Sequence, residues 1–208
     1  HKYGPDSKET IDTLYHLDQQ LTRFMRKAQR AAGSKKTLFV LTADHGITPI
    51  PEIIAKKGFP AYRYDSQELI DNLNNELNSY LEQQAYQKNN QKSNSEKTNI
   101  IQAYDNSQIY LNNNLFNQFD KQQQEDILLY IQSLAKKHPG IKQIWTYDEL
   151  KNKVCDPDSL ESYYKHQLYP GRSGQLIIQP HPYCDITEYK KGADHNSAYN
   201  YNTHVPLI

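Results

Sequence analysis

Residues whose chemistry suits a metal ion stand at the end of an apolar run. The stretch LFVLTADHGITPIPE covers residues 38–52, and its apolar part ends at Asp44, His45 and Gly46. A carboxylate and an imidazole side by side offer one hard oxygen and one borderline nitrogen, a pair that zinc accepts. Gly46 lets the chain turn sharply after them. Asp-His-Gly also occurs as an ordinary structural turn, so this motif alone does not define a metal site.

Two further stretches carry histidines that could take part in the same chemistry. HKYGPDS opens the chain with His1 ahead of a Gly-Pro turn, and ADHNSAYNYNTHVPLI carries Asp194 and His195 before a final apolar strand. Taken singly, His1 also fits a solvated terminal residue, and the late stretch also fits an ordinary polar loop. Three other polar residues near these motifs are not assigned as ligands: His166, Arg172 and His204. Arg172 is expected instead to brace the YPGRSG turn.

The elements that must position these residues alternate between helix and strand. Apolar residues recur at helical spacing from a capping-box-like start at Asp6 to Gly33, and an apolar strand over residues 37–42 follows. Such a strand is typical of a parallel sheet covered on both faces, where ligands gather at the carboxyl ends of strands. We therefore expect an α/β fold with a mostly parallel sheet, helices on both of its faces, and the Asp-His pair at one edge.

The middle of the chain predicts a smaller α+β lobe at about residues 66–150. Residues 66–81 have helical periodicity, and the polar stretch 83–98 is typical of a surface loop within a domain. The remaining elements follow in order: a hairpin over residues 100–111, an amphipathic helix over 121–137, and strands in IKQIWTY and GQLIIQP.

Composition argues against several kinds of partner. Lys plus Arg equals Asp plus Glu at 24 each, so no net charge attracts nucleic acid or an acidic membrane. No stretch approaches the roughly 20 apolar residues of a membrane span, and the start of the chain does not resemble a leader peptide. Cys155 and Cys184 are too far apart for a Cys-x-x-Cys zinc motif, and are either two thiols or one disulfide.

Together the three stretches resemble the alkaline phosphatase superfamily, in particular its branch of type I phosphodiesterase/nucleotide pyrophosphatase and phosphate-irrepressible alkaline phosphatases. That branch carries GHxxGPDS, TADHG and HGSxYxYDTHVPL segments in this order. Here they read HKYGPDS, TADHG and HNSAYNYNTHVPL. The resemblance runs from the first residue to the last, and implies that residues 1–208 are the C-terminal portion of an alkaline-phosphatase-like catalytic domain.

The resemblance also implies a set of metal ligands. Two zinc ions are expected: Asp44 and His45 match the adjacent pair that binds one ion, and His1 and His195 match two ligands of the other. The family also needs an Asp four residues before the position of His1, another upstream Asp, and an upstream Thr or Ser nucleophile. No catalytic residue is therefore expected in this chain itself.

The activity implied by the resemblance is a zinc-dependent phosphate monoesterase that acts on a small-molecule phosphate ester, in the periplasm or outside the cell. Asn196 stands where Gly is usual, and Asn202 stands where Asp is usual. Two alternatives stay open. One is a nucleotide pyrophosphatase/phosphodiesterase, or a sulfatase-like or phosphonate-cleaving relative, because substrate choice depends on residues near the missing nucleophile. The other is a non-catalytic fragment whose 17 Tyr and many Asn and Gln bind sugar or protein.

Overall fold

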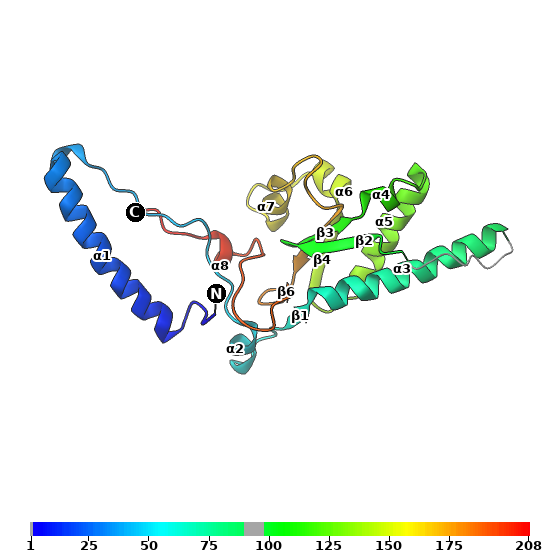
Figure 1. Ribbon diagram of the computed structural model, residues 1–208, viewed down its shortest axis with the longest axis horizontal. Coiled ribbons are helices and arrows are strands. Elements are labelled where there is room, and N and C mark those ends of the chain that lie inside the picture. Colours follow the sequence, from blue (N-terminus) through cyan, green and yellow to red (C-terminus); the bar gives the residue numbers. More distant parts are fainter. Residues whose placement is uncertain (1, 90–97) are drawn as a thin grey trace.

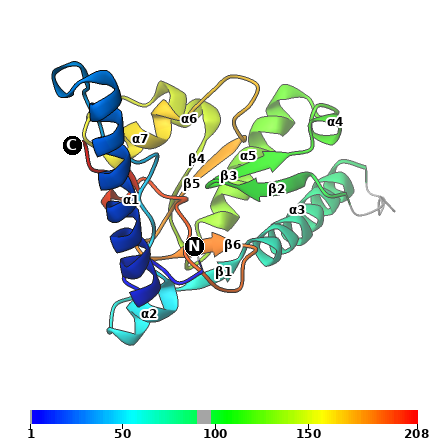
Figure 2. The same ribbon diagram turned by 60° about the vertical axis from the view of Figure 1, so that its left-hand side comes forward.

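A computed structural model describes residues 2–89 and 98–208 of the chain. In Figure 1 the long helix α1 (Lys8–Ala32) lies at one end of the molecule, and a lobe of strands and helices lies at the other. Extended segments of the chain connect the two parts. In Figure 2, after a turn of 60°, α1 stands in the foreground and the strands of the lobe are seen behind it. Within the described part of the chain, no helix has the length and apolar character that crossing a membrane requires.

Helix α1 forms as its periodicity predicts, but its apolar face is not covered. The Oγ atom of Ser7 accepts a hydrogen bond from the Thr10 N–H at 3.1 Å, so the cap lies one residue after the predicted start at Asp6. Gly33 ends the helix with φ 89°, a value that favours glycine. No residue of α1 is buried, and Leu14 is 58% exposed. Periodicity therefore predicted the helix but not its packing.

The segment after α1 is extended but joins no sheet. It follows the short 3₁₀ helix η1 (Ser34–Lys36), and its one ladder contact is an antiparallel bridge between Thr42 and Leu207. Leu41 and Ile208 exchange backbone hydrogen bonds of 2.9 and 3.1 Å. The prediction that residues 37–42 lie inside a parallel sheet is therefore wrong for the described chain, because no strand pairs with the segment on either side beyond this bridge.

A parallel strand pair with its helices confirms the predicted α/β class. Strands β1 (Arg63–Asp65) and β6 (Asp185–Thr187) pair in parallel, although 122 residues separate Arg63 from its partner Asp185. Helix α2 (Pro51–Lys56) precedes β1, and helix α3 (Ser66–Asn89) follows it directly. Among the described residues, parallel pairing is confined to these two strands.

The larger sheet is antiparallel and forms the centre of the lobe. Its strands lie in the order β2-β3-β5-β4, with these bounds: β2 (Ile101–Asp105), β3 (Gln108–Leu111), β5 (Leu176–Pro180) and β4 (Ile141–Thr146). The hairpin of β2 and β3 was predicted, and positive φ values at Asn106 and Ser107 form its tight turn. Strand β5 comes from outside residues 66–150, so the sheet takes in more of the chain than that range.

Helices cover both faces of the antiparallel sheet. On one face α3 and α5 (Lys121–Ala135) pack in the main core, where the rings of Tyr80 and Tyr130 stack 4.0 Å apart. On the other face a second cluster joins Trp145 and Ile177 of the sheet to helices α6 (Tyr147–Asn152) and α7 (Leu160–His166). Two short helices complete the described elements: α4 (Asn113–Phe116) and α8 (Asn200–Thr203).

One sequence expectation changes at this level, and one open alternative is decided. Helix α3 runs on to Asn89, so the loop predicted over residues 83–98 is wrong for its first part, and residues 90–97 lie outside the described residues. Residues 82–88 contain Glu, Gln, Ala and Lys and lack Gly and Pro, so their polarity does not break a helix. Cys155 and Cys184 are both free thiols, and Cys184 is buried.

Replacing Ile131 by valine should lower the free energy of unfolding by about 0.5–1.5 kcal/mol, because the lost methyl group leaves a gap in the main core. Ile131 is 0% exposed. The same change at Ile11, 47% exposed on α1, removes the same methyl group and should cost less than about 0.5 kcal/mol. Urea denaturation followed by the fluorescence of Trp145 measures both, and equal losses in the two variants would contradict the assigned core.

Candidate metal-binding site

Backbone pairing brings the Asp-His-Gly stretch to the late histidine motif. The N–H of Gly46 donates to the Asn202 carbonyl at 2.7 Å, and the N–H of Ile47 donates to the Tyr201 carbonyl at 2.8 Å. The N–H of Thr48 donates to the carbonyl of Asp194 at 2.7 Å. Two stretches about 150 residues apart in the sequence therefore lie side by side.

Three of the four predicted ligands gather at this junction. The imidazole rings of His45 and His195 stack with centroids 3.8 Å apart and planes 24° apart. The Oδ2 atom of Asp44 lies 3.7 Å from Nε2 of His45, and the side chain of Asp44 is 88% exposed. The fourth predicted ligand, His1, lies outside the described residues.

A hydrogen bond fixes which nitrogen of His45 is available. Its Nδ1 atom lies 2.6 Å from the carbonyl oxygen of Gly46, and a carbonyl can only accept, so Nδ1 carries the proton. In the neutral ring Nε2 then presents a lone pair, on the side where the Asp44 carboxylate lies. Metal-binding histidines commonly make this second hydrogen bond to a backbone carbonyl. The donor set of Asp44 and His45 therefore fits part of a cation site.

The described residues do not by themselves complete a metal site. In residues 2–89 and 98–208, no group of three or more His, Cys, Asp or Glu side chains is arranged to hold an ion. A catalytic zinc usually takes three protein ligands and keeps an open position. The geometry thus supplies part of a ligand set.

The YPGRSG turn is closed by a residue that the sequence analysis did not select. The Oγ atom of Ser173 accepts a hydrogen bond from the Tyr169 N–H at 2.8 Å, and the N–H groups of Arg172 and Ser173 both donate to the Tyr169 carbonyl. The expectation that Arg172 braces this turn therefore holds for its backbone, while the bracing side chain is that of Ser173.

An ion-pair network missed by the sequence analysis lies beside His195. Arg63 donates two hydrogen bonds to the carboxylate of Glu52, at 2.7 and 3.0 Å, and one to Oδ2 of Asp185 at 2.8 Å. A fourth hydrogen bond, at 2.6 Å, reaches the carbonyl of Gly192. Arg63 and Asp185 come from the paired strands β1 and β6, so no local spacing could have revealed the pair.

The network changes the acidity of its carboxylates. Burial raises the pKa of Asp185 to about 6, and the nearby carboxylate of Asp194 adds to the rise while Arg63 opposes it. The hydrogen bond from Arg63 lowers the pKa of Glu52. Arg63, Asp185 and His195 line one pocket of about 480 Å³, together with Lys2 and Lys191.

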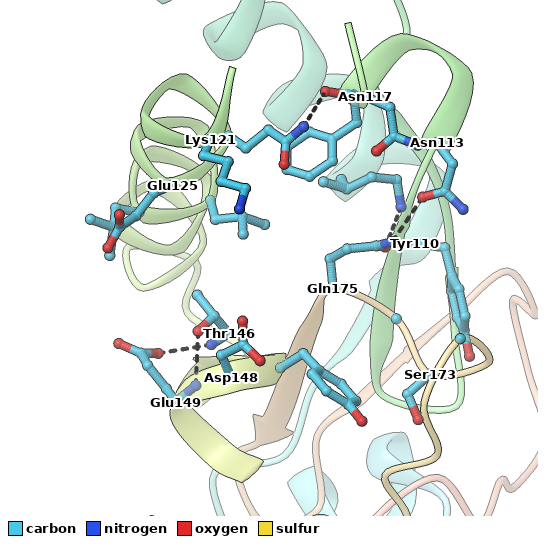
Figure 3. Close-up of a pocket in the computed structure, with 18 of the residues that line it drawn as sticks. Tyr110, Asn113, Asn117, Lys121, Glu125, Thr146, Asp148, Glu149, Ser173 and Gln175 are labelled. Atoms are coloured by element: carbon cyan, nitrogen blue, oxygen red, sulfur yellow. Dashed lines mark hydrogen bonds between the residues drawn. The ribbon is translucent and has the colours of Figure 1, made fainter. Parts of the chain in front are cut away.

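A larger cavity lies elsewhere and carries different chemistry. This groove of about 1130 Å³ runs between α4, α5, α6 and the turn before β5, and its lining contains no histidine. Figure 3 shows amide and charged side chains around it, among them Asn113, Lys121, Glu125 and Gln175. Some of these are already bound to the protein, because Gln175 accepts from the N–H of Leu111 and donates to Asn113. Size alone therefore does not identify the site.

The fold and the junction of the two motifs define a class of protein. A family model described as type I phosphodiesterase / nucleotide pyrophosphatase matches residues 1–205. The chain belongs to this family, as the sequence motifs predicted.

Particular relatives agree with this assignment. Alkaline phosphatase PafA of Elizabethkingia meningoseptica is 27% identical over 210 residues, which is 100% of this chain and 35% of the relative. A calcium-transporting ATPase of Myroides odoratus is 25% identical over 211 residues, with the same two shares. Alkaline phosphatase PhoV of Synechococcus elongatus is 39% identical over 57 residues, which is 27% of this chain and 10% of the relative. The chain thus spans about a third of the length of the relatives that match it throughout.

Solved structures show the same fold. The crystal structure of a substituted variant of alkaline phosphatase PafA matches with a TM-score of 0.77 and 25% identity, over 100% of this chain and 36% of that protein. The structure of wild type PafA matches with a TM-score of 0.72 and 23% identity, over 99% of this chain and 36% of that protein. The alkaline-phosphatase-like fold is therefore confirmed.

Proposed function

We propose that these residues form part of a metal-dependent phosphoric ester hydrolase. One observation carries the proposal: the rings of His45 and His195 stack at 3.8 Å, with the carboxylate of Asp44 beside them. The two motifs that meet there belong to a family described by its phosphodiesterases and nucleotide pyrophosphatases. Two segments that are distant in the sequence here bring two imidazoles and a carboxylate together, which a shared role as metal ligands would explain.

We infer that the metal is zinc and that two ions are bound in the complete enzyme. Asp44 and His45 would hold one ion, and His195 would hold the other together with His1. When bound, such a pair of ions stabilises the attacking and the leaving oxygen of a phosphoryl displacement. The contribution of this chain is to orient the ligands: the hydrogen bond from His45 Nδ1 to Gly46 fixes the ring so that Nε2 faces Asp44.

The nucleophile is proposed to lie outside this chain. In the family pattern an upstream Thr or Ser attacks the phosphorus, and an upstream Asp completes each metal site. This chain matches 35% of the length of PafA. We therefore expect the 208-residue chain to bind zinc weakly and to hydrolyse phosphate esters hardly at all, while a longer chain with the upstream part is active.

We propose a small-molecule phosphate monoester as the substrate, because two of the relatives are named alkaline phosphatases. The family description favours a second candidate, a phosphodiesterase or nucleotide pyrophosphatase that cleaves diesters. A periplasmic or secreted location is proposed from the resemblance alone.

The test is to assay the 208-residue chain and the longer chain on an aryl phosphate monoester and an aryl phosphate diester, each with added zinc and with a chelator. We expect chelator-sensitive hydrolysis of the monoester by the longer chain only. Preference for the diester would move the assignment to the phosphodiesterase candidate. Strong chelator-sensitive turnover by the 208-residue chain would refute the upstream nucleophile.

A further inference from the structure

We propose that Asn202 is a positioning residue that holds the extended segment of His45 against the loop of His195. Its consequence for metal binding rests on the function proposed above, while the positioning itself does not. Asn202 lies on α8, and it acts through the two segments that carry the rings.

The side chain of Asn202 joins both segments from a buried position. The residue is 3% exposed. Its Nδ2 atom donates to Oγ of Ser197 at 2.7 Å and lies 3.0 Å from Oγ1 of Thr48, while Oδ1 accepts from that same Thr48 hydroxyl at 3.1 Å. Thr48 follows His45 by three residues, and Ser197 follows His195 by two. One amide therefore links the two histidine segments.

The backbone around this amide leaves little room for adjustment. The carbonyl of Asn202 accepts the N–H of Gly46 at 2.7 Å. A Cβ atom on Gly46 would lie 2.1 Å from the carbonyl oxygen of Tyr201, so only glycine allows this approach. Because Gly46 adjoins His45, a shift of α8 away from the segment would carry His45 away from His195.

The chemistry of an amide suits this position. An amide both donates and accepts, so it can satisfy the buried hydroxyl of Thr48 and the partly buried hydroxyl of Ser197 at once without burying a charge. A carboxylate at the same place, as in the family pattern, has no N–H to donate, and both hydroxyls would have to turn and donate to it. Removing the amide leaves Thr48, which is 5% exposed, without its partner.

The measurement is the NMR spectrum of the 208-residue chain with isotope-labelled histidine, recorded without metal. Two rings stacked at 3.8 Å shift each other's proton signals upfield by their ring currents. Signals are assigned from variants that lack one ring or the other. The single Trp of the chain, Trp145, lies in the lobe core, so its fluorescence reports separately whether the lobe is folded.

Matched variants separate positioning from general damage. Thr48→Val keeps the shape and removes the hydroxyl, Thr48→Ser keeps the hydroxyl, and Thr203→Val makes the same change at an exposed neighbour of Asn202 on α8. We expect Thr48→Val and Asn202→Ala to lose the upfield shifts of His45 and His195 while Trp145 fluorescence stays unchanged. Thr48→Ser and Thr203→Val should keep the shifts.

The outcomes that overturn the proposal are specific. Upfield shifts that persist in both Thr48→Val and Asn202→Ala would refute it, and so would the absence of such shifts from the wild type. If Asn202→Ala alters the fluorescence of Trp145, the Thr48 variants test the proposal without it. Upfield shifts that are lost in Thr48→Val and kept in Thr48→Ser would then support the positioning role, and equal shifts in the two variants would refute it. The metal function is tested separately by adding zinc to the longer chain, which carries the proposed upstream ligands. If the His45 and His195 signals do not respond there, the positioning role stands and the proposed metal function fails.

Discussion

Replacing Arg63 by alanine should lower the free energy of unfolding by about 3–5 kcal/mol at pH 7.5. The side chains of Arg63 and Asp185 are 10% and 5% exposed, and their hydrogen bond measures 2.8 Å. Without the guanidinium, Asp185 keeps a buried charge that has lost its ion-pair partner, or must take up a proton. The carbonyl of Gly192 loses a hydrogen bond as well.

The loss should be smaller at pH 5 than at pH 7.5. The pKa of folded Asp185 is about 6, above its ordinary value of 3.8, so the folded state binds more protons and stability from this group falls as pH rises from about 4 to about 6. Removing Arg63 removes a charge that lowers this pKa, so the pKa rises further. At pH 5 the carboxyl is already largely protonated, and the missing cation matters less.

Urea denaturation followed by Trp145 fluorescence at both pH values measures this effect. Glu52→Gln is the control, because it removes the charge of the other, 49% exposed partner of Arg63 and should cost at most about 1 kcal/mol. Equal losses at the two pH values for Arg63→Ala, or a loss no greater than that of Glu52→Gln, would contradict the buried ion pair.

Replacing His195 by alanine in the longer, active chain should reduce zinc-dependent phosphate ester hydrolysis by more than about 100-fold. Loss of a group that hydrogen-bonds to a metal ligand commonly costs 10–100-fold, and loss of a ligand itself should cost more. The control is His204→Ala, which removes an exposed imidazole nine residues further along the same terminal segment. Rates with excess zinc, together with the zinc content of each purified variant, measure the effect. Equal activities of the two variants would show that His195 is not a metal ligand.

The sequence predicted the candidate site better than its surroundings. The order of the three motifs anticipated that His45 and His195 would meet, because family members share the tertiary arrangement that those motifs encode. The pair of Arg63 and Asp185 could not be predicted, since neither residue stands in a local pattern and only the pairing of β1 with β6 brings them together.

The fold was predictable where local chemistry decides it. The turn at Asn106 and the helix α5 follow from residue preferences and periodicity. Burial was not predictable in the same way: α1 and residues 37–42 carry apolar patterns, but a pattern does not say which segment covers it. Leu38, for example, is 87% exposed although it stands in an apolar run. Helix α3 is longer than the sequence pattern predicts, because polar side chains are typical of a loop but do not break a helix.

The most direct test of the metal site is anomalous X-ray diffraction from crystals of the longer chain, measured on both sides of the zinc absorption edge. We expect two zinc peaks about 4 Å apart, one beside Asp44 and His45 and the other beside His195. Zinc peaks at other residues, or no zinc peak beside these three side chains in an active enzyme, would contradict this expectation.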